Sequence, residues 1–136
     1  MNRMFREYVI SSDKSLLQID AIASFLRRSY WAGERALGTI EKSIENSMCF
    51  GVYHEDKQIA FARIVTDYAT MYYLADVYVD EQYRGQGIGK ALVQEIIHCE
   101  ELQGLTGLLG TKDAHELYEQ FGFERDAARF MRRAAR

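Results

Sequence analysis

Apolar residues recur every three or four positions between Leu16 and Tyr30, which predicts an amphipathic helix. Ser15 and Gln18 have the spacing of a capping box at its start, and Asp20 is an alternative N-cap one turn later. Apolar residues between positions 5 and 10 indicate a first strand before this helix. A polar loop over residues 31–35 and a second, shorter helix over residues 39–47 are expected after it.

The middle of the chain is rich in aromatic and β-branched residues, which favour strands. Runs of this kind cover residues 48–53, 58–66 and 71–79, and the polar turn at 54–57 joins the first two into a hairpin. A helix is expected from position 88, where apolar residues again recur at helical spacing. The centre is therefore predicted to be a β-meander that leads into a strand, a loop and a helix.

The last third predicts a short strand at 105–109 and then a helix through Tyr118. Asp113 and Glu116 have the spacing of a capping box for this helix, and Gly122 suits its C′ position. Phe123 and residues 128–131 are candidates for final strands. Taken together, the elements predict one α/β or α+β domain over residues 1–136.

Composition narrows the classes of function. The net charge is −3 from 17 basic and 20 acidic residues, so neither a nucleic-acid partner nor another polyanion is expected. No apolar run approaches the ~20 residues of a membrane helix, and the first residues hold no signal-peptide core. Two cysteines provide neither a disulfide scaffold nor the spacing of a metal site. We therefore expect a cytoplasmic protein without a metal or a membrane partner.

Three alternating glycines, Gly85, Gly87 and Gly89, lie between a predicted strand and a predicted helix. Glycine lets backbone N–H groups converge on an anion, and the start of a helix adds a partial positive charge. Arg84 and Lys90 flank the loop and could contact phosphates. The pattern predicts a phosphate-bearing ligand, most simply a pyrophosphate.

Two known phosphate motifs do not fit this loop. A P-loop would need glycine where Arg84 stands and serine or threonine where Ala91 stands. A dinucleotide fingerprint needs Gly-x-Gly-x-x-Gly and a later acidic residue, but Glu100 and Glu101 end the predicted helix instead of following a strand. From the residues alone, a glycine-rich turn without a ligand remains the alternative.

Arg84-x-x-Gly87-x-Gly89 resembles the Arg/Gln-x-x-Gly-x-Gly/Ala motif of the GNAT superfamily, the acetyl-CoA-dependent N-acetyltransferases. Residues 74–79 look like the fourth strand of that family, and residues 114–123 look like its second signature, which carries a tyrosine and a final Gly-Phe. The resemblance covers essentially the whole chain. It implies a mixed, mostly antiparallel sheet whose central strands splay apart, flanked by helices.

The resemblance also implies how acetyl-CoA, as cosubstrate, would be held. Val77 and Val79 match the strand backbone that pairs with pantetheine, and Thr111 stands where many relatives carry an asparagine that contacts the cofactor. The positions that match the pyrophosphate loop are Arg84, Gly85, Gln86, Gly87, Ile88, Gly89 and Lys90.

Tyr118 matches the family tyrosine that protonates the leaving CoA thiolate, although its helical spacing alone would favour a core aromatic. A phenol pKa of ~10 beside a thiol pKa of ~8.5 makes that transfer close to balanced. The general base is less clear. Asp76, inside a predicted buried strand, could act as the base, directly or through a water, or could hold an arginine such as Arg63 for structural reasons.

The acceptor is expected at the loop after the first helix, where Tyr30 and Trp31 could wall an amine pocket and Glu34 could attract a cation. The predicted function is transfer of an acetyl group to a primary amine, by direct attack in a ternary complex, and a small-molecule amine is favoured because the loop is short. The alternative is a non-catalytic module that binds acetyl-CoA or CoA, or a regulatory one. The sequence is compatible with a homodimer, and it leaves open both the acceptor's identity and the use of other acyl groups.

Overall fold

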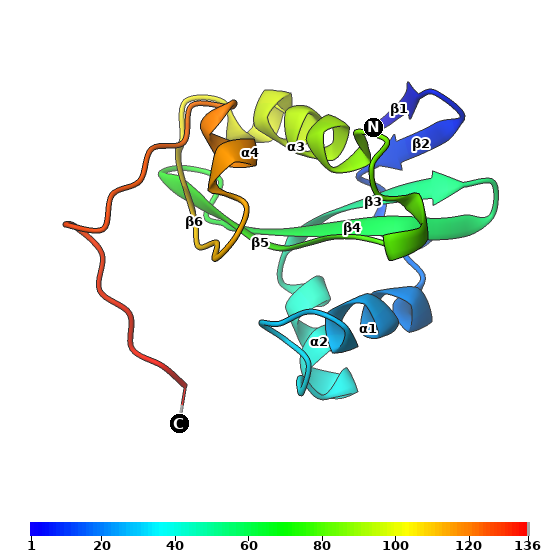
Figure 1. Ribbon diagram of the computed structural model, residues 1–136, viewed down its shortest axis with the longest axis horizontal. Coiled ribbons are helices and arrows are strands. Elements are labelled where there is room, and N and C mark those ends of the chain that lie inside the picture. The colour runs from blue at the N-terminus through cyan, green and yellow to red at the C-terminus, as the bar shows by residue number, and fades with distance from the viewer. Residues whose placement is uncertain (136) are drawn as a thin grey trace.

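A single open sheet organises the computed structural model, which describes residues 1–135. Its six strands lie in the order in which they occur in the sequence. Every neighbouring pair from β1 to β5 is antiparallel, and β6 runs parallel to β5. Helices α3 and α4 lie on one face of the sheet and α1 and α2 on the other (Figure 1). The expected mixed, mostly antiparallel fold is confirmed.

The strands are β1 (Asn2–Phe5), β2 (Tyr8–Ser11), β3 (Met48–His54), β4 (Lys57–Thr66), β5 (Met71–Val79) and β6 (Thr106–Leu109). The α-helices are α1 (Ile19–Arg27), α2 (Leu37–Glu45), α3 (Ile88–His98) and α4 (His115–Glu119). Short 3-10 turns cover Lys14–Leu16, Glu81–Tyr83 and Glu100–Leu102. Within residues 1–135, none of the helices has the length and the apolar character that crossing a membrane requires.

The N-terminal segment differs from its prediction in two ways. The single expected strand is a hairpin, β1–β2, which turns at Arg6 with a positive φ of 54°. Because β1 is largely exposed, it lacks the apolar alternation that would have revealed it. The first α-helix starts only at Ile19, since Asp13 caps the preceding 3-10 turn through Ser15 and no side chain caps α1. The predicted capping box at Ser15 is therefore wrong.

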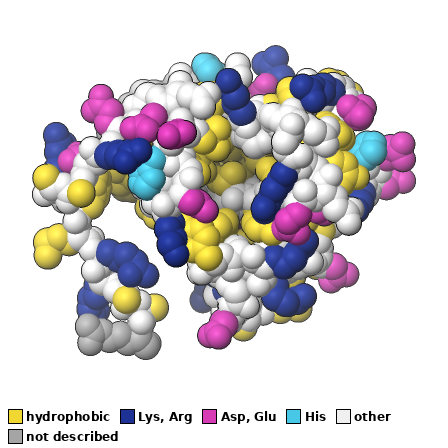
Figure 2. Space-filling model, viewed as in Figure 1, with side chains coloured by type: hydrophobic (Ala, Val, Ile, Leu, Met, Phe, Trp, Pro, Cys, Tyr) yellow, Lys and Arg dark blue, Asp and Glu magenta, His cyan; other side chains and the backbone are white. Residues whose placement is uncertain are grey.

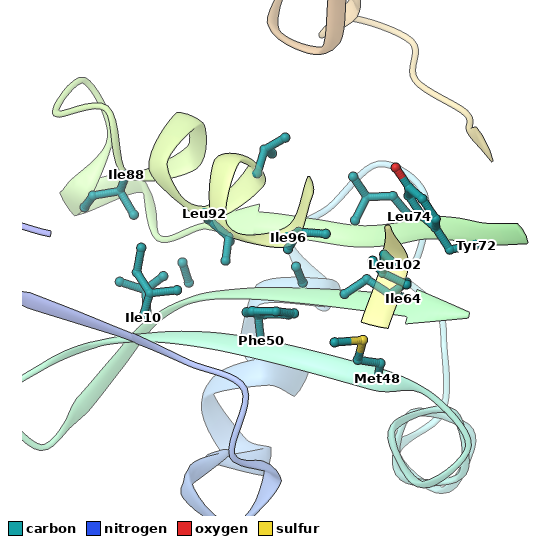
Figure 3. Close-up of a cluster of buried hydrophobic side chains, with 14 of the residues drawn as sticks. Ile10, Met48, Phe50, Ile64, Tyr72, Leu74, Ile88, Leu92, Ile96 and Leu102 are labelled. Atoms are coloured by element: carbon teal, nitrogen blue, oxygen red, sulfur yellow. The ribbon is translucent and has the colours of Figure 1, made fainter. Parts of the chain in front are cut away.

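Two hydrophobic cores sandwich the sheet. On one face, Ile88, Leu92 and Ile96 of α3 pack against strand residues that include Phe50 and Leu74 (Figure 3). The second core, on the opposite face, joins α1 and α2 to the sheet through Ile22, Phe25, Leu26, Ile40, Phe61 and Tyr78. The helical spacing of apolar residues thus aligns one stripe of each helix with the sheet.

A β-bulge interrupts β5 at Asp76. Arg63 pairs with Ala75 and Phe61 with Tyr78, so two residues of β5 face one residue of β4. Asp76 has a φ of 51°, in the left-handed region. The extra residue reverses the alternation of β5, so that Leu74 belongs to the α3 core while Tyr78 belongs to the α1–α2 core.

The pairing of β5 with β6 is short. It runs from Met71 with Thr106 to Leu74 with Leu109, and β6 ends there. Among the described residues, 1–135, no strand pairs with the rest of β5, from Ala75 to Val79, on this edge. Beyond Leu74 the two strands therefore separate, and the backbone of β5 is left accessible between them.

The C-terminal segment also differs from its prediction in its helix cap and in its final strands. No side chain caps α4, whose N-cap is Ala114, so the predicted Asp113–Glu116 capping box does not form. Gly122 follows α4 with a φ of 88°, and Phe123 N–H donates to the Tyr118 carbonyl, which confirms Gly122 as the C′ glycine. Residues 123–135 form no strand: Phe123 packs against the core on the α3 face, and the chain after it extends away from the sheet (Figure 1). The charged positions 124–126 and the local Arg129–Asp126 pair give this segment no continuous apolar face to dock.

We predict that Leu92→Ala destabilises the protein by about 2–5 kcal/mol, because Leu92 is fully buried between α3 and the sheet. Leu37→Ala, the same change at a leucine that is 53% exposed, should change the free energy of unfolding by no more than about 0.5 kcal/mol. Urea unfolding at equilibrium measures both. Equal losses in the two variants would contradict the assignment of this core.

Candidate acyl-transfer site

A cleft of about 640 Å³ opens where β5 and β6 separate. Its walls come from both faces of the sheet: the α1–α2 loop on one side, and the glycine loop and the α4 region on the other. Apolar side chains lie at the base of a hollow on this face, with charged side chains around it (Figure 2). The cleft brings together residues that are up to ninety positions apart, from Arg28 to Tyr118.

The glycine loop at one end of the cleft presents a row of free donors. Gly85 and Gly87 have φ values of 82° and 84°, which glycine adopts without strain. Gly87 is the N-cap of α3, and its carbonyl accepts from the Ala91 N–H at 3.0 Å. Within residues 1–135, no hydrogen bond uses the backbone N–H groups of residues 85–90. At a helix N-terminus, such a row suits an anion with several oxygens.

Side chains from other elements brace this loop. The Tyr8 hydroxyl donates to Gln86 Oε1 at 2.7 Å, and Gln86 Nε2 donates to the Tyr83 carbonyl at 3.3 Å. The rings of Tyr8, His54 and Tyr83 meet edge to face around this contact. The Gln86 side chain is therefore occupied within the protein, which leaves its backbone N–H for a ligand.

Charged residues at the rim form a small network around Glu81. Its carboxylate accepts from Arg28, from the Tyr78 hydroxyl and, at 3.4 Å, from Arg84. Arg84 also donates from Nε to the Val79 carbonyl at 2.9 Å, which ties the loop to the end of β5. The guanidinium of Arg84 thus lies at the mouth of the cleft, with part of its donor capacity already used.

The free edge of β5 lines the middle of the cleft. Asp80 N–H donates to Ile59 of β4 at 2.8 Å, so the alternate N–H groups, those of Val77 and Val79, point away from β4. Both valines line the cleft. An extended ligand that carries amide groups could therefore pair with β5 as an added strand would.

Tyr118 lies further along the cleft and is only 9% exposed. Burial, with smaller effects of Tyr30 and Asp113, raises the pKa of its phenol to about 12. The hydroxyl therefore stays protonated through the neutral range and can act as a hydrogen-bond donor. The Tyr30 hydroxyl accepts from the Lys112 N–H at 3.0 Å, which links the α1–α2 loop to the segment before α4.

The comparisons with known proteins agree with this geometry. Residues 45–125 match the family model for the acetyltransferase (GNAT) domain. The chain belongs to the GNAT family. A candidate acetyltransferase of Gibberella zeae is 32% identical over an alignment of 118 positions, which covers 72% of this chain and 66% of that protein. A GNAT structure from Xanthomonas campestris, also a candidate acetyltransferase, is 38% identical, with a TM-score of 0.91 over 97% of this chain and 96% of that chain.

A plant relative extends the comparison. The chloroplastic GCN5-related N-acetyltransferase 2 of Arabidopsis thaliana is 36% identical over 74 residues, which make up 53% of this chain and 29% of that protein. The chain therefore spans less than two thirds of the length of these curated relatives. The glycine loop and Tyr118 both lie inside the segment that the GNAT model matches.

Asp76 contacts Arg63, as expected if this carboxylate has a structural role instead of acting as a base. Its Oδ2 accepts from Arg63 Nε and from Arg35, each at 2.8 Å, and its Oδ1 accepts from Trp31 Nε1 at 2.8 Å. Burial works to raise the pKa of the carboxyl, but Arg63, Arg35 and Trp31 together lower it below its ordinary value of 3.8. A carboxylate stabilised in this way has low proton affinity, so the geometry gives no support to Asp76 as a base.

Five expected site residues are not among those that line the cleft: Asp76, Gln86, Lys90, Thr111 and Glu34. The Thr111 hydroxyl accepts from the Ala114 N–H at 3.0 Å, so it helps to start α4. Lys90 and Glu34 are exposed, and Glu34 does not line the cleft, whereas Tyr30 and Trp31 do.

Sequence reasoning missed the residues that brace the site. Tyr8 lies 78 positions from Gln86, and no local pattern joins them. Glu81 and Arg35 were not predicted as site residues, because Arg28 and Asp76, which they contact, are more than 40 positions away along the chain. The only useful signal was an acidic residue within a buried strand, which requires a partner.

We predict that Asp76→Asn destabilises the protein by about 3–5 kcal/mol at pH 7, because it leaves Arg63 and Arg35 facing a neutral amide. The folded-state pKa of Asp76 is lowered, so its stabilising effect is complete above its ordinary pKa of 3.8 and is lost as the pH falls through the folded-state value. The difference between wild type and variant should therefore shrink below pH ~4. Urea unfolding across pH measures it, with the exposed Asp56→Asn as control, and a difference independent of pH would contradict the role of charge.

Proposed function

We propose that this GNAT protein transfers an acetyl group from acetyl-CoA to the primary amine of a small molecule. The observation that carries the proposal is the continuity of two sets of free donors. The N–H groups of residues 85–90 suit a pyrophosphate, and the edge of β5 at Val77 and Val79 suits the amides of pantetheine. Acetyl-CoA carries both groups in that order, with the thioester beyond them.

The glycine loop fits such a ligand sterically. A Cβ at Gly85 would meet nothing within 4 Å, so that side of the loop is open to a phosphate. A Cβ at Gly89 would lie 3.6 Å from Val79 Cγ2, where the loop approaches β5. Side chains at these positions would narrow the space that the ligand's backbone contacts require.

The reaction is a direct displacement. The lone pair of the neutral amine nitrogen attacks the thioester carbonyl, the C–S bond breaks and its electron pair stays on sulfur. The nitrogen loses one proton as the amide forms, and sulfur gains one. An N–H of β5 beside the thioester would stabilise the oxyanion that develops during the attack.

Tyr118 is placed to assist the leaving sulfur as a hydrogen-bond donor. Its pKa of about 12 is well above a thiol pKa of about 8.5, so complete transfer of its proton to the thiolate is uphill by about 5 kcal/mol. The raised pKa makes this transfer less favourable than the ordinary phenol pKa would. A phenol that stays protonated can still donate a hydrogen bond to sulfur while charge builds up there.

The acceptor is expected where the α1–α2 loop closes the cleft. Tyr30 and Trp31 line this end, and their rings meet edge to face at 5.0 Å. The bond from Lys112 N–H to the Tyr30 hydroxyl spans the opening here, which favours a small amine over a folded protein surface. The alternative function is a module that binds acetyl-CoA without transferring the acetyl group. Such a module would use the same backbone N–H donors but would form no acetylated amine.

We predict that acetyl-CoA raises the melting temperature, whereas ATP and NAD at the same concentration do not. At about 100 times its dissociation constant, acetyl-CoA should add about 2.7 kcal/mol of stability. Thermal unfolding measures this, and thiol release with spermidine, tyramine, glucosamine and a short peptide then tests transfer. No shift at millimolar acetyl-CoA would refute the proposed ligand. A shift without thiol release from any amine would favour the binding module.

We predict that Tyr118→Phe lowers kcat for thiol release by about 100-fold while acetyl-CoA still shifts the melting temperature. The variant removes one hydroxyl and keeps the buried ring. Tyr68→Phe removes a hydroxyl from a tyrosine that is 58% exposed and should have no effect. An unchanged kcat in Tyr118→Phe would remove Tyr118 from the mechanism.

A further inference from the structure

The α1–α2 loop, residues 28–36, is anchored at both sides of the gap between β5 and β6. The Tyr30 hydroxyl accepts from the backbone of Lys112, which follows β6. The Trp31 indole N–H donates to Asp76 of β5. The loop itself is short and lies on the α1–α2 face of the sheet, opposite the glycine loop and α3 (Figure 1).

The two carboxylate oxygens of Asp76 accept hydrogen bonds from different groups. Oδ1 accepts from Trp31 Nε1, and Oδ2 accepts from both Arg63 and Arg35. Arg63 belongs to β4 and also donates to Ser47 Oγ at 3.2 Å, so it fixes the carboxylate to the sheet. Arg35 and Trp31 both belong to the loop, so the carboxylate fixes the loop at two points.

The side chain of Asp76 is only 2% exposed, and its position depends on the bulge. The positive φ of Asp76 turns this residue out of the regular strand, and Tyr78 beyond it packs with Phe25 of α1. The side chain thus faces the α1–α2 side of the sheet while Val77 keeps its place in the cleft. One residue therefore links the free edge of β5 to the opposite wall.

We infer that Asp76 is a positioning residue, which holds Trp31 as the wall of the acceptor pocket and so determines how the amine is bound. That this pocket binds the amine rests on the proposed function. That Asp76 anchors Trp31 does not depend on it. Trp31 keeps its N–H on Asp76 and its ring beside Tyr30 and Tyr78, in the cleft. An indole fixed by its N–H presents a rigid apolar face, on which the carbon chain of an amine can pack.

The anchoring predicts that changes at Asp76 affect the binding of the amine and the binding of acetyl-CoA differently. The hydrogen-bond partners of Asp76 lie on β4 and on the α1–α2 loop, and none lies on the glycine loop. Loss of the anchor should therefore weaken amine binding and leave acetyl-CoA binding intact. A general base would behave differently, because its loss lowers kcat and changes its dependence on pH.

Trp31 is the single tryptophan of the chain, so its fluorescence reports on the loop without any acceptor. In Asp76→Ala we expect a red-shifted emission and stronger quenching by acrylamide, because the indole gains solvent and mobility. In Asp76→Asn the amide oxygen can still accept from the indole, so the emission should stay closer to wild type. Arg35→Met removes the second loop anchor, keeps Asp76 and serves if Asp76→Ala fails to fold; it should increase quenching too. Asp56→Asn is the exposed control and should match wild type.

Kinetics complete the test, with spermidine, tyramine and glucosamine as probe acceptors. In Arg35→Met and Asp76→Ala, KM for the amine should rise by about tenfold, equivalent to about 1.4 kcal/mol, while the thermal shift by acetyl-CoA persists. Asp76→Asn, which can still accept from the indole, should raise KM less. Unchanged Trp31 emission and quenching in Asp76→Ala and Arg35→Met would overturn the inference. So would a fall in kcat with an altered pH profile and an unchanged amine KM. If acetyl-CoA fails to shift the wild type, the proposed function fails, but the fluorescence result still decides whether Asp76 anchors Trp31.

Discussion

The separation of β5 from β6 is the constraint on which the site depends. β6 pairs with β5 only from Met71 to Leu74, and the bulge at Asp76 lies two residues beyond the last of these pairs. A continuous sheet would use the N–H groups of Val77 and Val79 for a neighbouring strand. Because the strands part, those groups face the cleft, in line with the free N–H groups of the glycine loop. The same gap lets one cleft draw its walls from both faces of the sheet.

The buried carboxylate of Asp76 holds the α1–α2 loop, which forms the second wall of the cleft. An isolated carboxylate in that position would be strongly unfavourable, so its burial requires Arg63 and Arg35. Since Arg35 and Trp31 come from the α1–α2 loop, the ion cluster also fixes that loop. The bulge at Asp76, its ion pairs with Arg63 and Arg35, and the α1–α2 loop therefore depend on one another. The glycine loop is also braced by Tyr8 through Gln86, a contact that does not involve Asp76 or the α1–α2 loop.

How far the sequence predicts this structure depends on the range of the interactions. The central strands and α3 follow from local periodicity, and the glycine loop from its spacing, so they could be identified to within a residue or two. The β1–β2 hairpin could not, because its first strand is exposed and lacks alternation. The predicted final strands do not form for a different reason: Arg129 interrupts the apolar pattern at 128–131 and charged residues precede it at 124–126, so the segment has no continuous apolar face. The contacts of Tyr8, Arg35 and Glu81 are set only by tertiary packing.

Amide hydrogen exchange with and without acetyl-CoA tests the central claim most directly, namely that two separate sets of backbone N–H groups hold one ligand. Acetyl-CoA should slow exchange at Val77 and Val79 and across residues 85–90, and leave the amides of the β1–β2 hairpin unchanged. CoA without the acetyl group should protect the same amides, since the pyrophosphate and pantetheine make those contacts. Protection confined to the glycine loop, or the absence of any protection along β5, would contradict the account.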